Sequence, residues 1–287
     1  IFMFSCTAIY PKYTSLLICL LSPQTGNGKI ERQRYAREQS RKDPSMKLVI
    51  VRHADPDYSI DSLTPTGWRE AELLSDRLVR TPADFYYVSP LGRAQDTASL
   101  TLKKLNRTAE TCEWLQEFSP RIIKPGMDRT SCIWDWLPEL WTKELRYYDP
   151  EEWYHTDAMR SIHVEEEFKR VTSEFDRLLA AHGYEREGLY YRAVRPNRDT
   201  IVLFCHFGVE CVLLSHLMHV SPMPLWHGLC AAPSSVTTIY TEERRQGIAS
   251  FRAGTFGDVS HLYAAGEEPS FAARFCETWD NKEERHD

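Results

Sequence analysis

The sequence predicts an α/β fold with a mostly parallel central sheet and helices on both faces of that sheet. Short apolar runs recur at 47–51, 84–88 and 200–205, with the composition of strands that are buried on both faces. A helical pattern follows each of these runs. Strands that alternate with helices build parallel sheets, whose ligands bind beyond the carboxyl ends of the strands.

The helices are predicted from side chains spaced three and four positions apart. The helix after the first run has an apolar face made of four residues: Trp68, Ala71, Leu74 and Leu78. The helix after the second run uses Ala94, Thr97, Ala98 and Leu102. A longer helix runs from near Val164 to His182, and Gly183 is its natural stop. The third run leads into a helix over 206–218, and 234–242 with 247–254 are predicted to be a closing pair of strands.

The first 45 residues differ from the rest of the chain. They hold seven basic and three acidic residues, a net charge of +4, whereas the remainder has a net charge of -10. Their apolar stretch is broken by Pro11 and Lys12, unlike a secretory signal. We therefore predict that 1–45 is a leader that is disordered or not native, with Met46 as the start. A membrane anchor is the alternative.

Residues 46–287 are predicted to form one domain, into which 119–162 is inserted as a cap over the sheet. This stretch is rich in Trp and does not follow the alternation of strands and helices. Its aromatic residues can form a wall that faces the substrate or a small core of the cap itself, and the core is favoured because large apolar residues are normally buried. These residues are Trp134, Trp136, Trp141, Tyr147, Tyr148, Trp153 and Tyr154.

The composition of the chain limits the classes of binding partner and the location that we expect. An acidic body argues against a nucleic-acid binder, which normally presents a basic face. No apolar run of 18 residues occurs, so we expect no transmembrane helix. The eight cysteines include no C-x-x-C pair, which favours reduced thiols and a cytoplasmic location. The oligomeric state stays open, with a homodimer as one option.

Residues whose side chains can bind an anion or act as a nucleophile stand at the end of each predicted parallel strand or follow it. Arg52 and His53 end the first, Ser89 and Arg93 follow the second, and His206 follows the third. Arginine matches phosphate oxygens with a planar fork of donors, and imidazole can be a nucleophile or a donor. Taken singly, each has a structural explanation, as a surface ion pair or a polar strand end. Their joint placement predicts an anion pocket that contains a nucleophile.

These residues resemble the histidine phosphatase superfamily, which is phosphoglycerate-mutase-like. The resemblance is carried by R-H at Arg52 and His53, by S-P-x-x-R-A-x-x-T-A at 89–98, and by H-F-G at 206–208. An L-T-x-x-G segment at 63–67 adds to it. The three motifs occur in the expected order over about 46–259, each at a predicted strand end.

The resemblance implies a mechanism and a set of residues. His53 would form a phosphohistidine, while Arg52, Arg93 and His206 bind the phosphate, without metal or cofactor. One branch of the family has H-D at the second histidine, and Phe207 excludes it, which leaves branch 1. That branch takes its general acid from an L-x-E segment, which selects Glu117.

Two other acids compete with Glu117 for the role of general acid. Glu113 and Glu110 lie at nearby spacing in the same segment, where a solvated strand edge is their structural explanation. We favour Glu117, and Glu113 stays open as the main alternative.

The function predicted is a metal-independent phosphatase that hydrolyses a small phosphomonoester. A phosphoglycerate or phosphosugar mutase is the first alternative, and a non-catalytic module that binds a phospho-ligand is the second. Ala54 replaces the glycine of the family's R-H-G, which adds a steric limit if φ is positive there. The A-D-P-D-Y-S stretch lacks the Asn-containing segment of the family's mutases, which favours the hydrolase. The D-P-D stretch that contains Asp55 and Asp57 predicts a turn rather than a metal site.

Overall fold

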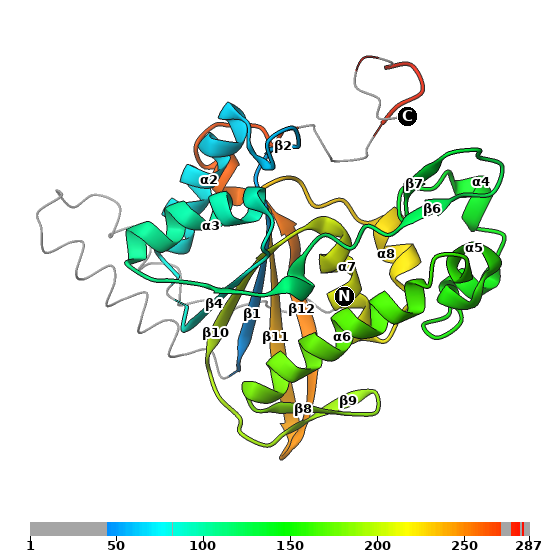
Figure 1. The fold of residues 1–287 in the computed structure, drawn as a ribbon. Coiled ribbons are helices and arrows are strands. Elements are labelled where there is room, and N and C mark those ends of the chain that lie inside the picture. The colour runs from blue at the N-terminus through cyan, green and yellow to red at the C-terminus, as the bar shows by residue number, and fades with distance from the viewer. Residues whose placement is uncertain (1–44, 82, 271–276, 282, 284–287) are drawn as a thin grey trace, which may run out of the picture.

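The structure, a computed structural model, describes residues 45–81, 83–270, 277–281 and 283. The predicted leader therefore lies outside the described residues, apart from its last position. The centre of the molecule is an eight-stranded sheet (Figure 1). Its order is β5 (Glu110–Thr111), β4 (Phe85–Val88), β10 (Thr200–Cys205), β1 (Lys47–Arg52), β11 (Val236–Arg245), β12 (Ile248–Asp258), β9 (Tyr190–Ala193) and β8 (Tyr184–Glu187).

The sheet is parallel at its core and antiparallel beyond it. Strands β5, β4, β10 and β1 pair in parallel, and β11 then pairs antiparallel with β1. The closing pair predicted from the sequence is confirmed as β11 and β12. The hairpin of β8 and β9, which extends the sheet at its edge, was not predicted. Its strands are short and rich in charged residues, so they lack the apolar run typical of a central strand.

Helices cover both faces of the sheet, which confirms the predicted fold class. In β1, Leu48 and Ile50 belong to one apolar cluster, whereas Val49 and Val51 belong to another. This alternation is the period of two expected of a strand that is buried on both faces. The main helices are α2 (Pro65–Leu78), α3 (Gly92–Leu105), α6 (Val164–Ala181), α7 (Phe207–Met218) and α8 (Pro222–Gly228), followed by the short α9 (Ser260–Tyr263).

The apolar clusters assign these helices to faces. Helices α2 and α3 contribute to the cluster with Val49 and Val51, and α6, α7 and α8 to the cluster with Leu48 and Ile50. Across the described part of the chain, no helix combines the length and the hydropathy that crossing a bilayer requires.

The prediction that Trp68 belongs to the buried face of α2 is wrong. Ala71, Leu74 and Leu78 are buried as predicted, but Trp68 is 39% exposed. The neighbouring Gly67 faces the body instead, because a Cβ there would lie 2.1 Å from the carbonyl oxygen of Asp55. This close approach of the helix requires glycine, and it rotates Trp68 toward solvent.

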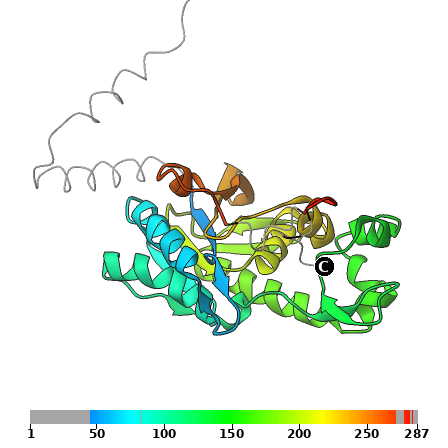
Figure 2. The same cartoon turned by 90° about the horizontal axis from the view of Figure 1, so that it is seen from above.

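The stretch 119–162 lies on the side of the molecule away from α2 and α3 (Figures 1 and 2). Its aromatic side chains mostly join the core cluster of α6 and α7, which agrees with the core interpretation; Tyr148 is exposed. That the stretch acts as a cap stays a prediction. Its elements are β6 (Arg121–Ile123), β7 (Thr130–Cys132), α4 (Pro138–Trp141), η3 (Leu145–Tyr148), η4 (Trp153–His155) and α5 (Asp157–Arg160), and the remaining short elements are β2 (Pro56–Asp57), β3 (Ser62–Leu63) and η2 (Glu113–Leu115).

Candidate active site

The strand register brings the predicted site residues to one edge of the sheet. Arg52 pairs with Cys205, so the chain leaves β1 and β10 at the same level, and the N–H of His53 donates to the Cys205 carbonyl at 3.0 Å. The rings of His53 and His206 lie with their centroids 5.1 Å apart. Both arginines, Arg52 and Arg93, lie close enough to lower the pKa of each histidine. The structure therefore places together the four residues expected to meet.

His53 is held as a neutral imidazole. Only 2% of the residue is exposed, and its Nδ1 lies 2.8 Å from the Ala54 carbonyl oxygen. Because a carbonyl can only accept, Nδ1 carries the proton, which leaves the lone pair on Nε2. Burial, followed by the charges of Arg52 and Arg93, lowers the pKa of His53 well below its ordinary value. A neutral ring with an unprotonated Nε2 is the form that can act as a nucleophile.

His206 is positioned by Ser89. Its Nε2 lies 2.8 Å from the Ser89 hydroxyl, which also accepts from the N–H of Leu91 at 3.3 Å. The hydroxyl is thereby free to donate to Nε2, and the ring proton then sits on Nδ1. Within the described residues no group accepts from this buried Nδ1, so an oxygen of a bound anion would satisfy it. Burial is the main cause that lowers the pKa of His206 well below its usual value.

Arg52 is fixed by the loop before β11. Its NH1 donates to the Ala231 carbonyl, its backbone N–H donates to the Ser235 carbonyl at 3.1 Å, and its guanidinium lies 5.7 Å from the centroid of the Phe207 ring. The residue is 3% exposed. A buried guanidinium beside two neutral imidazoles makes the site cationic, as an anion pocket requires.

Arg93 is held by an acid that the sequence analysis missed. Its NH1 lies 2.5 Å from Asp61 Oδ1, and Asp61 Oδ2 accepts from the N–H of Gly92 at 2.7 Å. Asp61 has a φ of 49°, and the Arg93 guanidinium also lies 5.3 Å from the centroid of the Tyr58 ring. The two contacts from Asp61 orient Arg93 at the start of α3. An isolated Asp in a turn carries no sequence signal for this role.

Glu117 lies at the site, whereas its two rivals do not. Glu117 Oε1 accepts from the N–H groups of Phe118 at 2.9 Å and of Val209 at 3.1 Å. Burial raises the pKa of Glu117, although the nearby arginines oppose this shift. Glu113 and Glu110 are exposed to solvent. A buried carboxyl group with a raised pKa, close to the imidazole and arginine side chains of a candidate site, has the properties of a general acid.

A serine in an unusual conformation holds the backbone of His53, and sequence reasoning missed it. Ser234 has a φ of 59°, and its N–H donates to the carbonyl of His53 at 3.0 Å. The Ser234 hydroxyl lies 3.1 Å from Nε2 of His261. Strained backbone of this kind often occurs at functional sites. The left-handed φ of a serine is not visible in its residue type.

The two acids that follow His53 in the sequence, Asp55 and Asp57, belong to local structure. Asp55 accepts from the hydroxyl groups of Thr64 at 2.6 Å and Ser270 at 2.5 Å, and Asp57 accepts from the N–H of Ser59 at 3.0 Å. These bonds are those of a turn that is tied to its surroundings. They agree with the turn interpretation.

Ala54 does not carry the strain that its position in the motif raised as a concern. It is not among the described residues with a positive φ, its N–H donates to Thr97 Oγ1 at 3.0 Å, and its methyl group is buried with Leu63 and Ala71. Ala54→Gly is therefore expected to leave kcat/KM within about twofold and to lower the free energy of unfolding by about 1 kcal/mol, through lost burial and added chain entropy. Steady-state kinetics and urea unfolding check both. A large gain in activity would show instead that the methyl group obstructs the site.

A second buried acid near the site, Glu210, predicts a pH dependence of stability. Burial raises its pKa from 4.5 to about 7. Between about pH 4.5 and pH 7, Glu210 is therefore protonated in the folded state and ionised in the unfolded state. The free energy of unfolding falls as pH rises through this range. Glu210→Gln should remove this loss and be more stable than wild type at pH 8 by up to about 3 kcal/mol. Urea unfolding at pH 5 and pH 8 measures the difference, with the exposed Glu268→Gln as control. A difference that is the same at both pH values would contradict the prediction.

The chain resembles known proteins both in sequence and in fold. The family model of the histidine phosphatase superfamily (branch 1) matches residues 48–253. The crystal structure of a phosphoserine phosphatase from Entamoeba histolytica with 3-phosphoglyceric acid has a TM-score of 0.50 at 16% identity, and the match covers 76% of this chain and 99% of that one. A mycobacterial glucosyl-3-phosphoglycerate phosphatase has a TM-score of 0.50 at 17% identity, covering 74% and 99%. No curated protein matches the chain. At these identities the structural likenesses show the fold.

Proposed function

From the premise that the chain belongs to branch 1 of the histidine phosphatase superfamily, we propose that it is a metal-independent phosphatase. In this proposal it hydrolyses a small phosphomonoester through a phosphohistidine on His53. The observation that carries the proposal is the neutral, buried imidazole of His53, whose Nε2 lone pair lies within the field of two arginines.

The proposed reaction has two steps. In the first, Nε2 of His53 attacks phosphorus, the P–O bond to the leaving alcohol breaks, and Glu117 gives its proton to the alcohol oxygen. In the second, Glu117 takes a proton from water, whose oxygen attacks phosphorus and breaks the P–N bond to release phosphate. Arg52, Arg93 and His206 donate to the phosphoryl oxygens, on which charge develops during both transfers.

Hydrolysis is favoured over the mutase alternative by two observations. The segment after His53 forms the compact turn of β2 and β3 rather than the Asn-containing stretch of the family's mutases. The structures similar in fold that are described above carry the names of phosphatases. The free thiols of Cys112, Cys132, Cys205 and Cys211 support our placement of the enzyme in the cytoplasm.

The test is phosphate release from 4-nitrophenyl phosphate by the full chain in the presence of EDTA. We expect stoichiometric release of phosphate and a phosphoenzyme that is stable in alkali and lost in acid. Phosphoryl transfer to an added acceptor without net phosphate release would support the mutase and overturn the proposal. Saturable binding of phosphate esters without turnover would support the non-catalytic module. Activity that EDTA abolishes would refute the metal-independent mechanism.

A further inference from the structure

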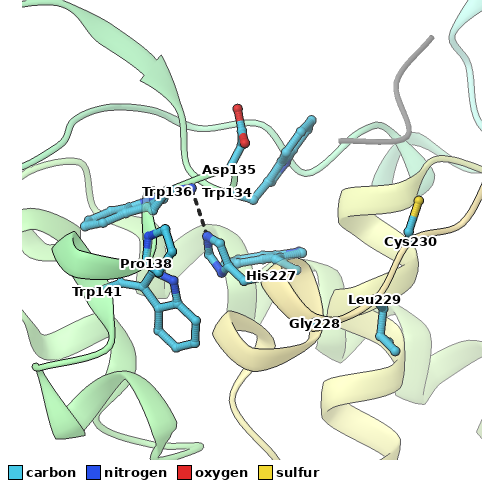
Figure 3. Close-up of a pocket in the computed structure, with 10 residues that line it drawn as sticks. Trp134, Asp135, Trp136, Pro138, Trp141, His227, Gly228, Leu229 and Cys230 are labelled. Carbon is cyan, nitrogen blue, oxygen red and sulfur yellow. Dashed lines mark hydrogen bonds between the residues drawn. The ribbon is translucent and has the colours of Figure 1, made fainter. Parts of the chain in front are cut away.

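A pocket of ≈ 310 Å³ lies between the 134–141 segment and α8 (Figure 3). We call it the tryptophan pocket. The roles proposed above for the catalytic residues use none of its lining. Its lining includes the indole side chains of Trp134, Trp136, Trp141 and Trp226, together with Asp135 and His227.

The tryptophan pocket adjoins the proposed general acid. The indole N–H of Trp134 donates to the Phe118 carbonyl at 3.0 Å, and the Phe118 N–H donates to Glu117 at 2.9 Å. Trp134 Nε1 and Glu117 Oε1 both lie within 2.7 Å of the point that a Cβ on Gly208 would occupy. In the proposed reaction Glu117 reaches the oxygen of the leaving alcohol, which places that alcohol on the side of the site where Trp134 lies.

The aromatic walls of the pocket are held in place. The indole N–H of Trp226 donates to the Gly208 carbonyl at 3.0 Å, and Trp141 stacks on His227 with ring centroids 4.7 Å apart. His227 Nδ1 donates to the Met223 carbonyl at 2.7 Å, and its Nε2 accepts from the N–H of Trp136 at 2.9 Å (Figure 3). The flat faces are thus formed before any ligand binds, which lowers the entropic cost of binding.

The described lining offers no positive charge. His227 uses both ring nitrogens, and burial lowers its pKa to about 4, so the ring is neutral. Lys124 lies nearby but directs its ammonium to the carbonyls of Trp134 and Asp135. Asp135 is the only charged side chain among the lining residues, and its carboxylate points away from Trp141 (Figure 3). A carboxylate on the substrate would find no cation here and would lose its hydration.

We propose that the tryptophan pocket binds the alcohol part of the substrate, and that this alcohol is an uncharged group with an aromatic ring. The inference rests on the proposed function, because Glu117 connects the pocket to the leaving oxygen. The lining contains four tryptophan side chains, against which an aromatic ring can pack edge to face or offset, whereas a glycerate or a serine carboxylate does not match the described charges.

The test compares kcat/KM of the full chain for benzyl phosphate, ethyl phosphate and 3-phosphoglycerate, all esters of alkyl alcohols. We expect kcat/KM for benzyl phosphate to be about tenfold higher than for ethyl phosphate, which corresponds to the free energy of one good aromatic contact. We expect the lowest kcat/KM for 3-phosphoglycerate. Trp141→Ala should lower kcat/KM for benzyl phosphate far more than kcat/KM for ethyl phosphate, so that most of the advantage of benzyl phosphate is lost. Equal values for benzyl and ethyl phosphate, or a preference for 3-phosphoglycerate, would overturn the proposal.

A pair of surface variants keeps the test independent of core packing, which Trp141→Ala also disturbs. Pro138→Arg adds a cation to the lining at an exposed position, whereas Leu137→Arg adds it one residue away, outside the lining, at a residue that is 56% exposed. We expect Pro138→Arg to raise the ratio of kcat/KM for 3-phosphoglycerate to kcat/KM for benzyl phosphate by about tenfold, because the new guanidinium can pair with the carboxylate. Leu137→Arg should leave the ratio unchanged. The same ratio in both variants would refute the pocket's role.

Failure of the proposed function has a different signature. It would appear as no phosphate release from any of the three esters. Dissociation constants from calorimetry would then test, independently of catalysis, whether the pocket binds the aromatic group. Tighter binding of benzyl phosphate than of ethyl phosphate, lost in Trp141→Ala, would support the pocket, and equal binding would overturn it.

Discussion

His53→Ala is expected to lower kcat for phosphomonoester hydrolysis by at least about 10⁴-fold, because it removes the atom that we propose forms the bond to phosphorus. The remaining groups, Arg52, Arg93 and His206, would still bind the ester. We therefore expect KM or the dissociation constant of the substrate to change far less than kcat. No phosphoenzyme should form in this variant.

The measurement is phosphate release together with alkali-quenched labelling, for wild type and for two variants. His155→Ala is the control, because it removes an imidazole that lies in η4 and pairs only weakly with surface carboxylates at 3.5 and 3.6 Å. It should retain wild-type activity. If His53→Ala kept a tenth of the activity, or if labelled enzyme still formed, the nucleophile would have to be another residue.

Much of the site was predictable because most of its residues stand at the carboxyl ends of buried strands or shortly after them. The apolar runs that become β1, β4 and β10 are recognisable in the sequence, and parallel strands bring their carboxyl ends to one edge. Arg52, His53 and His206 therefore meet because of the sheet register rather than any side-chain preference of their own. Glu117 follows the very short β5, so only the family resemblance selected it over Glu113.

The supporting residues were not predictable, for two physical reasons. Asp61 and Ser234 act through left-handed backbone conformations that their residue types permit but do not demand. Trp68 was misassigned because the pattern of apolar residues in α2 does not record how closely Gly67 approaches Asp55. The β8 and β9 hairpin is charged and lies at the sheet edge, where burial imposes little pattern.

The loss of kcat/KM in Glu117→Gln should depend on the substrate, and it should be larger when the leaving oxygen needs a proton. For benzyl phosphate, whose alcohol leaves poorly, we expect kcat/KM to fall by about 10²- to 10⁴-fold, the usual contribution of a general acid. For 4-nitrophenyl phosphate, whose phenolate leaves without protonation, the fall should be below about tenfold. Glu113→Gln is the matched control, since Glu113 is exposed and its carboxylate accepts from the side chain of Gln116 at 3.2 Å.

The pH dependence supplies a second and independent criterion. Burial raises the pKa of Glu117, so the protonated form persists to higher pH than in a free carboxyl group. In wild type, kcat/KM for benzyl phosphate should decline as pH rises through this pKa, because the acid loses the proton it must donate. The decline should be absent in Glu117→Gln and retained in Glu113→Gln. If Glu113→Gln abolished it instead, the proton would come from Glu113, and the exposed position of that residue would have to change during turnover.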